Sequence, residues 1–285
     1  MDSSLKYEVD QLIENSVNED LLLGDATTDA LFKDEIVGKA SILAKSNGIL
    51  CGSYVASKVF KRIDPVLEIE WFLREGDSFV GEDESSVAEI SGSISSILKA
   101  ERTAINFLQH LSGIATMTKG YVDAIAPYKT QILDTRKTIP GLRHLQKYAV
   151  TVGGGKNHRK NLGDGILIKD NHIKFNEING LSISDVVKKS RDNSEASADI
   201  EVEVDNLDQF RTVLVQEPDI ILLDNMDIET MKMAVKINNN KALLEASGGV
   251  TLGTVKAIAE TGVDLISVGA LTHSSSALDM SLNIL

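Results

Sequence analysis

The second half of the chain repeats a strand-then-helix pattern, and this repetition limits the possible folds more than any other feature. After about Thr130, six short apolar runs appear, at Gln131–Thr135, Gly165–Lys169, Ile200–Val204, Asp219–Leu223, Ala242–Glu245 and Asp264–Val268. Segments long enough for helices separate them, including Ser184–Ser190, Leu207–Gln216, Ile228–Asn238 and Thr251–Thr261. Alternating strands and helices predict a parallel sheet, either open or closed into a barrel.

Each apolar run ends in charged or small polar residues. These are Arg136 and Lys137, Lys169, Glu203, Asp224, Ser247 and Gly269, and from Glu203 onward they are 21, 23 and 22 residues apart. The carboxyl ends of parallel strands form the face where α/β folds bind ligands. Polar residues are also common at strand ends simply because these ends meet water. Six strand ends in register, basic first and acidic later, favour a ligand-binding rim.

The first hundred residues mix element types. Lys6–Asn15 has the pattern of an amphipathic helix, and Gly48–Phe60 and Val66–Arg74 predict strands or short helices between turns. Ser86–Ala100 carries small and apolar residues at helical spacing, and Glu101–Met117 continues as a helix. This part of the chain is predicted to be an α+β unit.

The charge distribution is uneven. The net charge of −13 argues against nonspecific nucleic-acid binding, which needs a basic surface. The segment from Arg136 to Lys174 nevertheless holds nine Lys or Arg and two acidic residues, a local charge of +7 that leaves −20 for the rest. Such a segment is either a solvated face or a site that concentrates an attractive field for a small polyanionic substrate.

Targeting and redox signals are few. Met1–Ser16 is acidic and amphipathic, so we expect no signal peptide, and no apolar run approaches the roughly 20 residues of a membrane helix. Cys51 is the only cysteine, which excludes an intrachain disulfide. We therefore expect a cytoplasmic protein.

The predicted rim has a basic part, an acidic part and glycine-rich turns. The basic part (Arg136, Lys137, His158, Arg159 and Lys169) suits carboxylates and phosphates. The acidic part (Glu203 and Asp224) suits ribose hydroxyls, or magnesium held through water. The turns at 247–249 and 269–272 suit a phosphate. Together they predict a phosphorylated sugar and a multiply anionic partner as ligands.

Other motifs are weaker. Gly153–Gly155 lacks the Gly-Lys-Ser/Thr ending of a Walker loop and is interpreted as a flexible turn. His158 and His172 lack zinc spacing and a third ligand, so no protein-bound metal is predicted. Cys51 is interpreted as a packed thiol, and His110 and His144 as surface or core residues.

Nine motifs, spread in order over nearly the whole chain, resemble the quinolinate phosphoribosyltransferase family. They are Gly24–Thr28, Glu101–Leu108 with Ser112–Thr116, Asp134–Thr138 with Pro140-Gly141, Gly153–Gly155 with Asn157–Arg159, Leu167–His172, Glu201–Val204, Leu223–Asn225, Glu245–Gly249 and Val268–His273. Each motif alone is weak, but their combination is specific.

The resemblance implies a type II phosphoribosyltransferase. Its α/β fold would have an N-terminal α/β sandwich at residues 1–115 and an incomplete, seven-stranded α/β barrel at 116–285, with the last residues packing back on the first domain. One strand is therefore absent from the six identified above. The family also implies a homodimer with shared active sites, with hexamers as a further possibility.

The resemblance also implies residue roles. Arg102 would reach the partner's site and bind a quinolinate carboxylate, and Arg136, His158 and Arg159 would complete that pocket. Thr135 would also bind substrate. The catalytic set would be Lys137, Lys169, Glu203 and Asp224, with the two acids holding ribose hydroxyls and a substrate-associated Mg²⁺–pyrophosphate assembly. The turns Ser247, Gly248, Gly249 and Val268, Gly269, Ala270 would bind the 5′-phosphate. The implied reaction joins quinolinate to phosphoribosyl pyrophosphate and gives nicotinate mononucleotide, CO2 and pyrophosphate, a step of NAD biosynthesis.

Three other functions are compared with this hypothesis. The family's molybdenum-transport-associated homologue shares its fold, but the intact Asn157–Arg159 and Leu167–His172 motifs favour the enzyme. A nicotinate phosphoribosyltransferase acts on a monocarboxylate and would need fewer arginines. A non-catalytic phosphosugar-binding barrel would not need both the acidic pair and the full basic set. The segment Arg191–Asp199 is polar and is interpreted as a surface loop.

Overall fold

The computed structural model describes residues 3–32, 34–81, 85–195 and 197–285. The chain folds into two compact units. The first comprises Met1–Lys119, Ile139–Gly154 and Ser274–Leu285, and the second Gly120–Thr138 and Gly155–His273. The long helix α4 (Ile94–Ala124) begins in the first unit and ends in the second. Among the described residues, no helix is both long and apolar enough to cross a bilayer.

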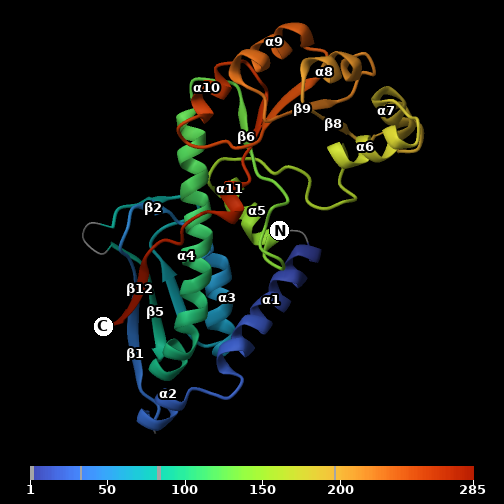
Figure 1. Ribbon diagram of the computed structural model, residues 1–285. Coiled ribbons are helices and arrows are strands. Elements are labelled where there is room, and N and C mark those ends of the chain that lie inside the picture. The colour runs from blue at the N-terminus through green and yellow to red at the C-terminus, as the bar shows by residue number, and fades with distance from the viewer. Residues whose placement is uncertain (1–2, 33, 82–84, 196) are drawn as a thin grey trace. The chain divides into compact units, whose positions relative to one another are not determined.

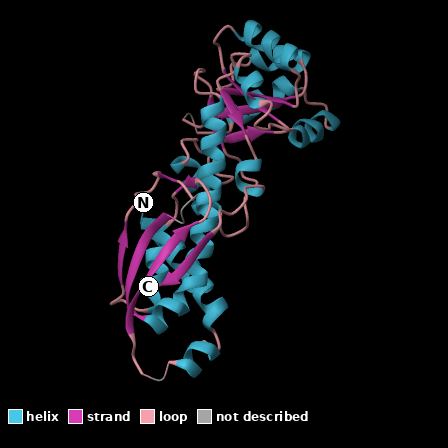
Figure 2. Ribbon diagram, turned by 90° about the vertical axis from the view of Figure 1, so that its left-hand side faces the viewer, coloured by secondary structure: helices cyan, strands magenta, loops and turns pink. Residues whose placement is uncertain are grey.

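An antiparallel sheet forms one layer of the first unit, with helices packed behind it (Figures 1 and 2). Its strands, in spatial order, are β12 (Met280–Ile284), β1 (Val37–Ala44), β5 (Ser85–Ser93) and β3 (Glu68–Trp71). A small second sheet pairs β2 (Gly48–Ile49) with β4 (Ser78–Phe79). The helices are α1 (Ser3–Leu21), α2 (Ala26–Leu31), α3 (Ser53–Ile63), α5 (Arg143–Val152) and most of α4. The pairing of β12 with β1 brings the last residues into the sheet of the first unit.

The helix expected at Ser86–Ala100 is wrong for its first half. Residues 85–93 form β5, which pairs with β1 on one side and β3 on the other, and α4 starts only at Ile94. Val87 and Ile90 are fully buried by these pairings, and the hydroxyl groups of Ser41 and Ser86 lie 2.6 Å apart. Partners about fifty residues away in the sequence thus override the local spacing of small residues.

A parallel six-stranded sheet forms the centre of the second unit. Its order is β6 (Gln131–Leu133), β11 (Leu265–Ser267), β10 (Leu243–Ser247), β9 (Ile220–Asp224), β8 (Ile200–Val204) and β7 (Ile166–Ile168). All six predicted strands are confirmed, with ends that differ by at most two residues. The helices are α6 (Asp170–Ile178), α7 (Ile183–Asp192), α8 (Leu207–Leu214), α9 (Ile228–Asn238), α10 (Val255–Ala259) and α11 (Ala270–His273), and Figure 1 shows several of them around the strands.

The sheet is an incomplete barrel. The first strand of this unit in the chain, β6, pairs with the last, β11. On its other side β6 has an isolated parallel bridge from Leu133 to Lys156, at the position of the missing seventh strand. Within the described residues no strand pairing joins Lys156 to β7, so the barrel stays open there.

In the second unit, caps and buried apolar faces hold the helices outside the parallel sheet. The Asn206 side chain accepts hydrogen bonds from two backbone N–H groups at the start of α8, and Asp227 caps α9 in the same way. Phe210 and Val213 are fully buried on the face of α8 that packs on β8 and β9. Burial of one such side chain stabilises the fold by about 1.5–3 kcal/mol. This packing fixes the strands whose carboxyl ends carry the polar residues.

The polar segment Arg191–Asp199 is only partly a loop. Helix α7 extends to Asp192, and the Arg191 guanidinium donates to the Glu217 carbonyl at 2.8 Å. Residues 193–195 and 197–199 lie outside regular elements, and Ala196 lies outside the described residues.

Candidate active site

A cavity of about 560 Å³ lies at the carboxyl ends of the barrel strands in the second unit. The predicted residues that line it are Thr135, Arg136, Lys137, His158, Arg159, Lys169, Glu203, Asp224, Ser247, Gly248 and Gly249. The register explains this gathering, since Ser247 lies beside Asp224 and Ile168 beside Val202 on neighbouring strands. The parallel sheet therefore brings residues that are far apart in the sequence to one rim.

Two arginines form the basic part of the cavity. The Nε of Arg136 is buried and makes no hydrogen bond with any described residue. Burial lowers the pKa of Arg159, and the nearby positive charge of Arg136 lowers it further. Two guanidinium groups that face one cavity and repel each other are stabilised by an anion between them.

The acidic part lies on neighbouring strands. The Lys169 ammonium donates to Glu203 at 2.8 Å, and Glu203 is buried while Lys169 is exposed. The Asp224 carboxylate accepts a hydrogen bond from the Asn225 side chain at 2.7 Å. These contacts hold the carboxylates at the rim as hydrogen-bond acceptors.

The turn after β10 requires glycine. Gly248 has φ +97°, and a Cβ there would lie 2.1 Å from Oδ1 of Asn225. Asn225 itself is left-handed, with φ +51°, and its N–H donates to the Ser247 carbonyl at 2.9 Å. Asn225 also lines the cavity, which the sequence analysis did not predict.

The turn after β11 lies beside the cavity rather than in its lining. Val268 is buried, and its N–H donates to the Leu133 carbonyl at 2.9 Å. A Cβ on Gly269 would lie 3.2 Å from Cδ of Lys137, and the Thr272 hydroxyl donates to the Lys137 carbonyl at 2.8 Å. Ala270 begins the short helix α11. The turn is therefore joined to the Lys137 segment.

Some predicted basic residues lie elsewhere. Arg102 is an exposed residue of α4 in the first unit, 3.6 Å from Glu101. Arg143 and Lys147 belong to α5, also in the first unit. The basic residues from Arg136 to Lys174 are therefore divided between the two units.

Asp134, which was not predicted as a site residue, is fully buried and orders the basic loop. Its carboxylate accepts hydrogen bonds from the Asn157 side chain at 2.6 Å and from the His158 N–H at 2.9 Å. Arg159 follows directly. The sequence could have indicated this role. A carboxylate next to a buried apolar strand is expected to be buried too, and a buried carboxylate needs hydrogen-bond donors.

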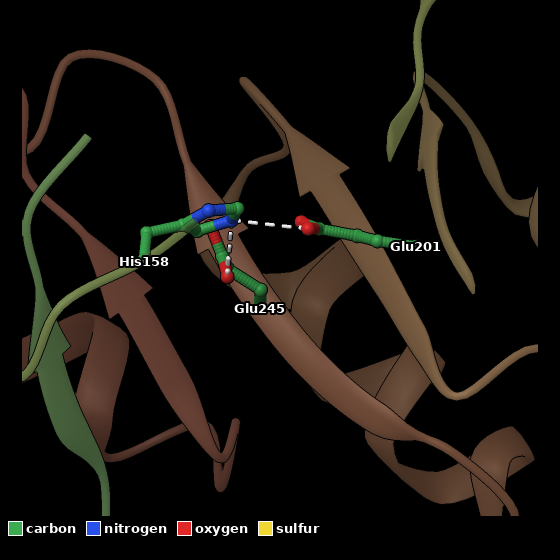
Figure 3. A group of neighbouring side chains, drawn as sticks. All are labelled: His158, Glu201 and Glu245. Atoms are coloured by element: carbon green, nitrogen blue, oxygen red, sulfur yellow. Dashed lines mark ion pairs between the residues drawn. The ribbon is translucent and has the colours of Figure 1, made fainter. Parts of the chain in front are cut away.

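A second unpredicted feature lies beneath His158 (Figure 3). Nε2 of His158 is 3.0 Å from Oε2 of Glu201 and 3.5 Å from Oε2 of Glu245. Burial raises the pKa of Glu245 to about 7, and the neighbouring Glu201 raises it too. The three side chains are close enough to hold a metal ion. The strands β8 and β10 bring these acids together, which residue spacing alone did not indicate.

The weaker motifs have structural explanations. Gly153 and Gly154 form a turn at the end of α5, and Gly154 has φ +89°. Gly153 is buried, and a Cβ there would lie 2.3 Å from the Ala115 carbonyl, so this position of the turn requires close packing. Cys51 is buried, and burial raises the pKa of its thiol. Burial lowers the pKa of His110, which contacts Gln146 at 2.9 Å.

An incomplete α/β barrel with paired arginines and carboxylates at its carboxyl rim defines an enzyme-like site for multiply anionic, phosphorylated ligands. Comparison with known proteins identifies the family to which the chain belongs within this class. The model of the quinolinate phosphoribosyl transferase C-terminal domain matches residues 114–283, and the N-terminal domain model matches residues 25–112. The chain belongs to the quinolinate phosphoribosyl transferase family.

Individual relatives agree over nearly the whole chain. A probable nicotinate-nucleotide pyrophosphorylase [carboxylating] of Synechocystis is 41% identical over 97% of this chain and 92% of its own length. A mitochondrial quinolinate phosphoribosyltransferase [decarboxylating] of Nicotiana glauca is 40% identical over 98% and 82%. The solved nicotinate-nucleotide pyrophosphorylase of Francisella tularensis has a TM-score of 0.92 and 40% identity over 98% and 96%.

Proposed function

We propose that this protein is the enzyme that transfers the phosphoribosyl group of phosphoribosyl pyrophosphate to quinolinate. The products are nicotinate mononucleotide, CO2 and pyrophosphate, in de novo NAD biosynthesis. The names of relatives that are 38–41% identical over nearly the full chain support this reaction. They do not favour the molybdenum-transport-associated homologue or a non-catalytic barrel.

The observation that carries the proposal is the pairing of Arg136 with Arg159. Both line the cavity, the Arg136 Nε lacks a hydrogen-bond partner among the described residues, and Arg159 is destabilised as a cation. A dicarboxylate such as quinolinate supplies the two anionic groups that this arrangement needs. A monocarboxylate would neutralise only one of the two guanidinium groups.

The remaining rim residues suit the sugar phosphate. Carboxylates of Glu203 and Asp224 accept hydrogen bonds from ribose hydroxyls, and the backbone of Ser247–Gly249 faces the 5′-phosphate. Lys137 and Lys169 place positive charge near the reacting centre. Their role is to orient the substrates and to stabilise charge that develops in the transition state.

The chemistry requires no covalent nucleophile from the protein. The pyridine nitrogen of quinolinate attacks C1 of the sugar while the C1–O bond to pyrophosphate breaks and that electron pair leaves with pyrophosphate. The positive pyridinium nitrogen then stabilises the electron pair that is left on C2 when the 2-carboxylate departs as CO2, and C2 takes up a proton. The lysines hold the departing anion close to the rim.

Magnesium fits the donor set. Glu203 and Asp224 are oxygen donors on neighbouring strands, the ligand type that hydrated Mg²⁺ prefers. These residues would meet the ion through water while pyrophosphate binds it directly. When bound, magnesium supplies positive charge to the leaving pyrophosphate.

The assembly and location extend the proposal. We propose that the protein forms a homodimer, in which Arg102 from one subunit completes the carboxylate pocket of the other. Measurement of the molecular mass in solution distinguishes dimers from hexamers. The exposure of Arg102 on α4 is consistent with this use. A cytoplasmic location and a domain boundary near residue 115 are parts of the same proposal.

The test is a direct assay. Purified protein is incubated with quinolinate, phosphoribosyl pyrophosphate and Mg²⁺, and nicotinate mononucleotide and CO2 are followed. We expect product from quinolinate and none from nicotinate, and loss of product in Arg159→Ala. Arg211→Ala, which changes an exposed arginine of α8, serves as the matched control. A folded protein that forms no product from quinolinate would refute the proposal.

A further inference from the structure

The ring of His158 is oriented by two different hydrogen-bond partners. The backbone N–H of Arg159 points at Nδ1 of His158, with the two nitrogens 2.7 Å apart. An N–H group can be directed at this nitrogen only if the nitrogen is an acceptor, without a proton of its own. The proton of the imidazole must then be on Nε2.

The opposite side of the ring matches this assignment. Nε2 lies 3.0 Å from Oε2 of Glu201, a hydrogen-bond distance, while Oε2 of Glu245 is farther, at 3.5 Å (Figure 3). Glu201 and Glu245 are 5% and 0% exposed. Both ring nitrogens are therefore engaged by the protein, and neither is left to bind a substrate carboxylate.

We propose that His158 is a positioning residue, held neutral with its proton on Nε2 by Glu201, and that it fixes the backbone of Arg159. The positive charge of the cavity then comes from its arginines and lysines and not from this histidine. Three contacts hold the loop. The Asp134 carboxylate accepts from the His158 N–H, the His158 ring accepts from the Arg159 N–H, and Glu201 lies at hydrogen-bond distance from the ring.

Two other states of the ring are less compatible with these contacts. An imidazolium carries a proton on Nδ1, which would face the Arg159 N–H at 2.7 Å and repel it. A metal ion bound at Nε2 between Glu201 and Glu245 would also require a proton on Nδ1, because a metal-bound neutral imidazole keeps its proton on the other nitrogen.

The ring state can be measured without any activity. The chain has five histidines, so ¹⁵N-histidine labelling gives few signals, and His158→Gln assigns those of residue 158. At pH 7 we expect one nitrogen with the shift of an unprotonated acceptor, Nδ1, and one with that of a protonated donor, Nε2. Two protonated nitrogens, a proton on Nδ1, or a stoichiometric transition metal in protein purified without chelators would overturn the proposal.

The consequence for Arg159 rests on the proposed function and is tested by kinetics. Glu201→Gln keeps an oxygen that can accept from Nε2, whereas Glu201→Met removes it at similar length. We expect the KM for quinolinate to rise about tenfold in the Met variant and far less in the Gln variant, with little change for phosphoribosyl pyrophosphate. Equal rises for both substrates, or for both variants, would refute positioning of Arg159.

Failure of the proposed function and failure of the proposal for His158 can be distinguished. Absence of quinolinate activity in the unmodified protein refutes the proposed function, while the nitrogen shifts still decide the state of His158. If Glu201→Met does not fold, His158→Gln against His158→Ala replaces it. The Gln side chain can still donate to Glu201, so we expect it to retain a lower KM for quinolinate than Ala does. An equal KM in the two variants would overturn the positioning role.

Discussion

Replacement of Glu245 by Gln should make the protein more stable at neutral and alkaline pH. Glu245 is fully buried, and its carboxyl has a pKa raised from 4.5 to about 7, chiefly by burial and then by Glu201. Ser267 and the positive charge of Lys169 act in the opposite direction. The folded protein therefore prefers the protonated carboxyl, whereas the unfolded chain ionises it freely.

The sign of the pH dependence follows from this difference. Below pH 4.5 the group is protonated in both states, and the full stability is present. As pH rises towards about 7, the unfolded state loses its proton first, so the free energy of unfolding falls. Each pKa unit is worth about 1.4 kcal/mol, so the total loss is on the order of 3 kcal/mol. Glutamine has a similar shape and cannot ionise, so the variant avoids this loss.

The assay is urea denaturation followed by circular dichroism at several pH values from 5 to 8. We expect the free energy of unfolding of Glu245→Gln, minus that of the unmodified protein, to increase from pH 5 to about 7 and then to level off, because the folded state also loses the proton there. Glu177→Gln, at an exposed position on α6, is the control and should show no such trend. A difference for Glu245→Gln that stays constant with pH would show that the carboxyl is already ionised in the folded state.

Three further changes test the site. Arg136→Ala should raise the KM for quinolinate far more than that for phosphoribosyl pyrophosphate, and equal effects in steady-state kinetics would remove Arg136 from the carboxylate pocket. Gly248→Ala introduces strain at φ +97° and a contact with Asn225, so we expect a loss of about 1–3 kcal/mol in urea denaturation and a raised KM for phosphoribosyl pyrophosphate. An unchanged variant would contradict the need for glycine there. Asp134→Ala leaves the His158 N–H without its buried acceptor and should cost about 1–3 kcal/mol or more, while an unchanged thermal midpoint would show that this anchor is dispensable.

The barrel could be predicted from the sequence because its strands are buried on both faces. Such strands are short apolar runs, and their spacing stays close to one strand–helix unit, so Ile200–Val204 was predicted with its observed bounds. The same regularity located Glu203 and Asp224 at strand ends. Residue type and position in the repeat were sufficient there.

The first unit was less predictable because its pairings are long-range. Nothing local in residues 85–93 distinguishes a strand from a helix, and β1 and β3 decide the outcome. Glu201 and Glu245 were missed for a related reason. Each belongs to an apolar run, and only the neighbouring strands show that they meet beneath His158.

The late strands of the sequence complete both sheets, and this has a consequence for folding. Strand β11 joins β6 to the rest of the parallel sheet, and β12 adds to β1 in the first unit. The Thr272 hydroxyl reaches the Lys137 carbonyl across 135 positions of the chain. Contacts of such separation form slowly, because a long loop must be ordered before they stabilise anything. During synthesis, neither sheet can be completed until residues 265–284 have emerged from the ribosome, so the rim of the cavity is assembled only after these strands are made.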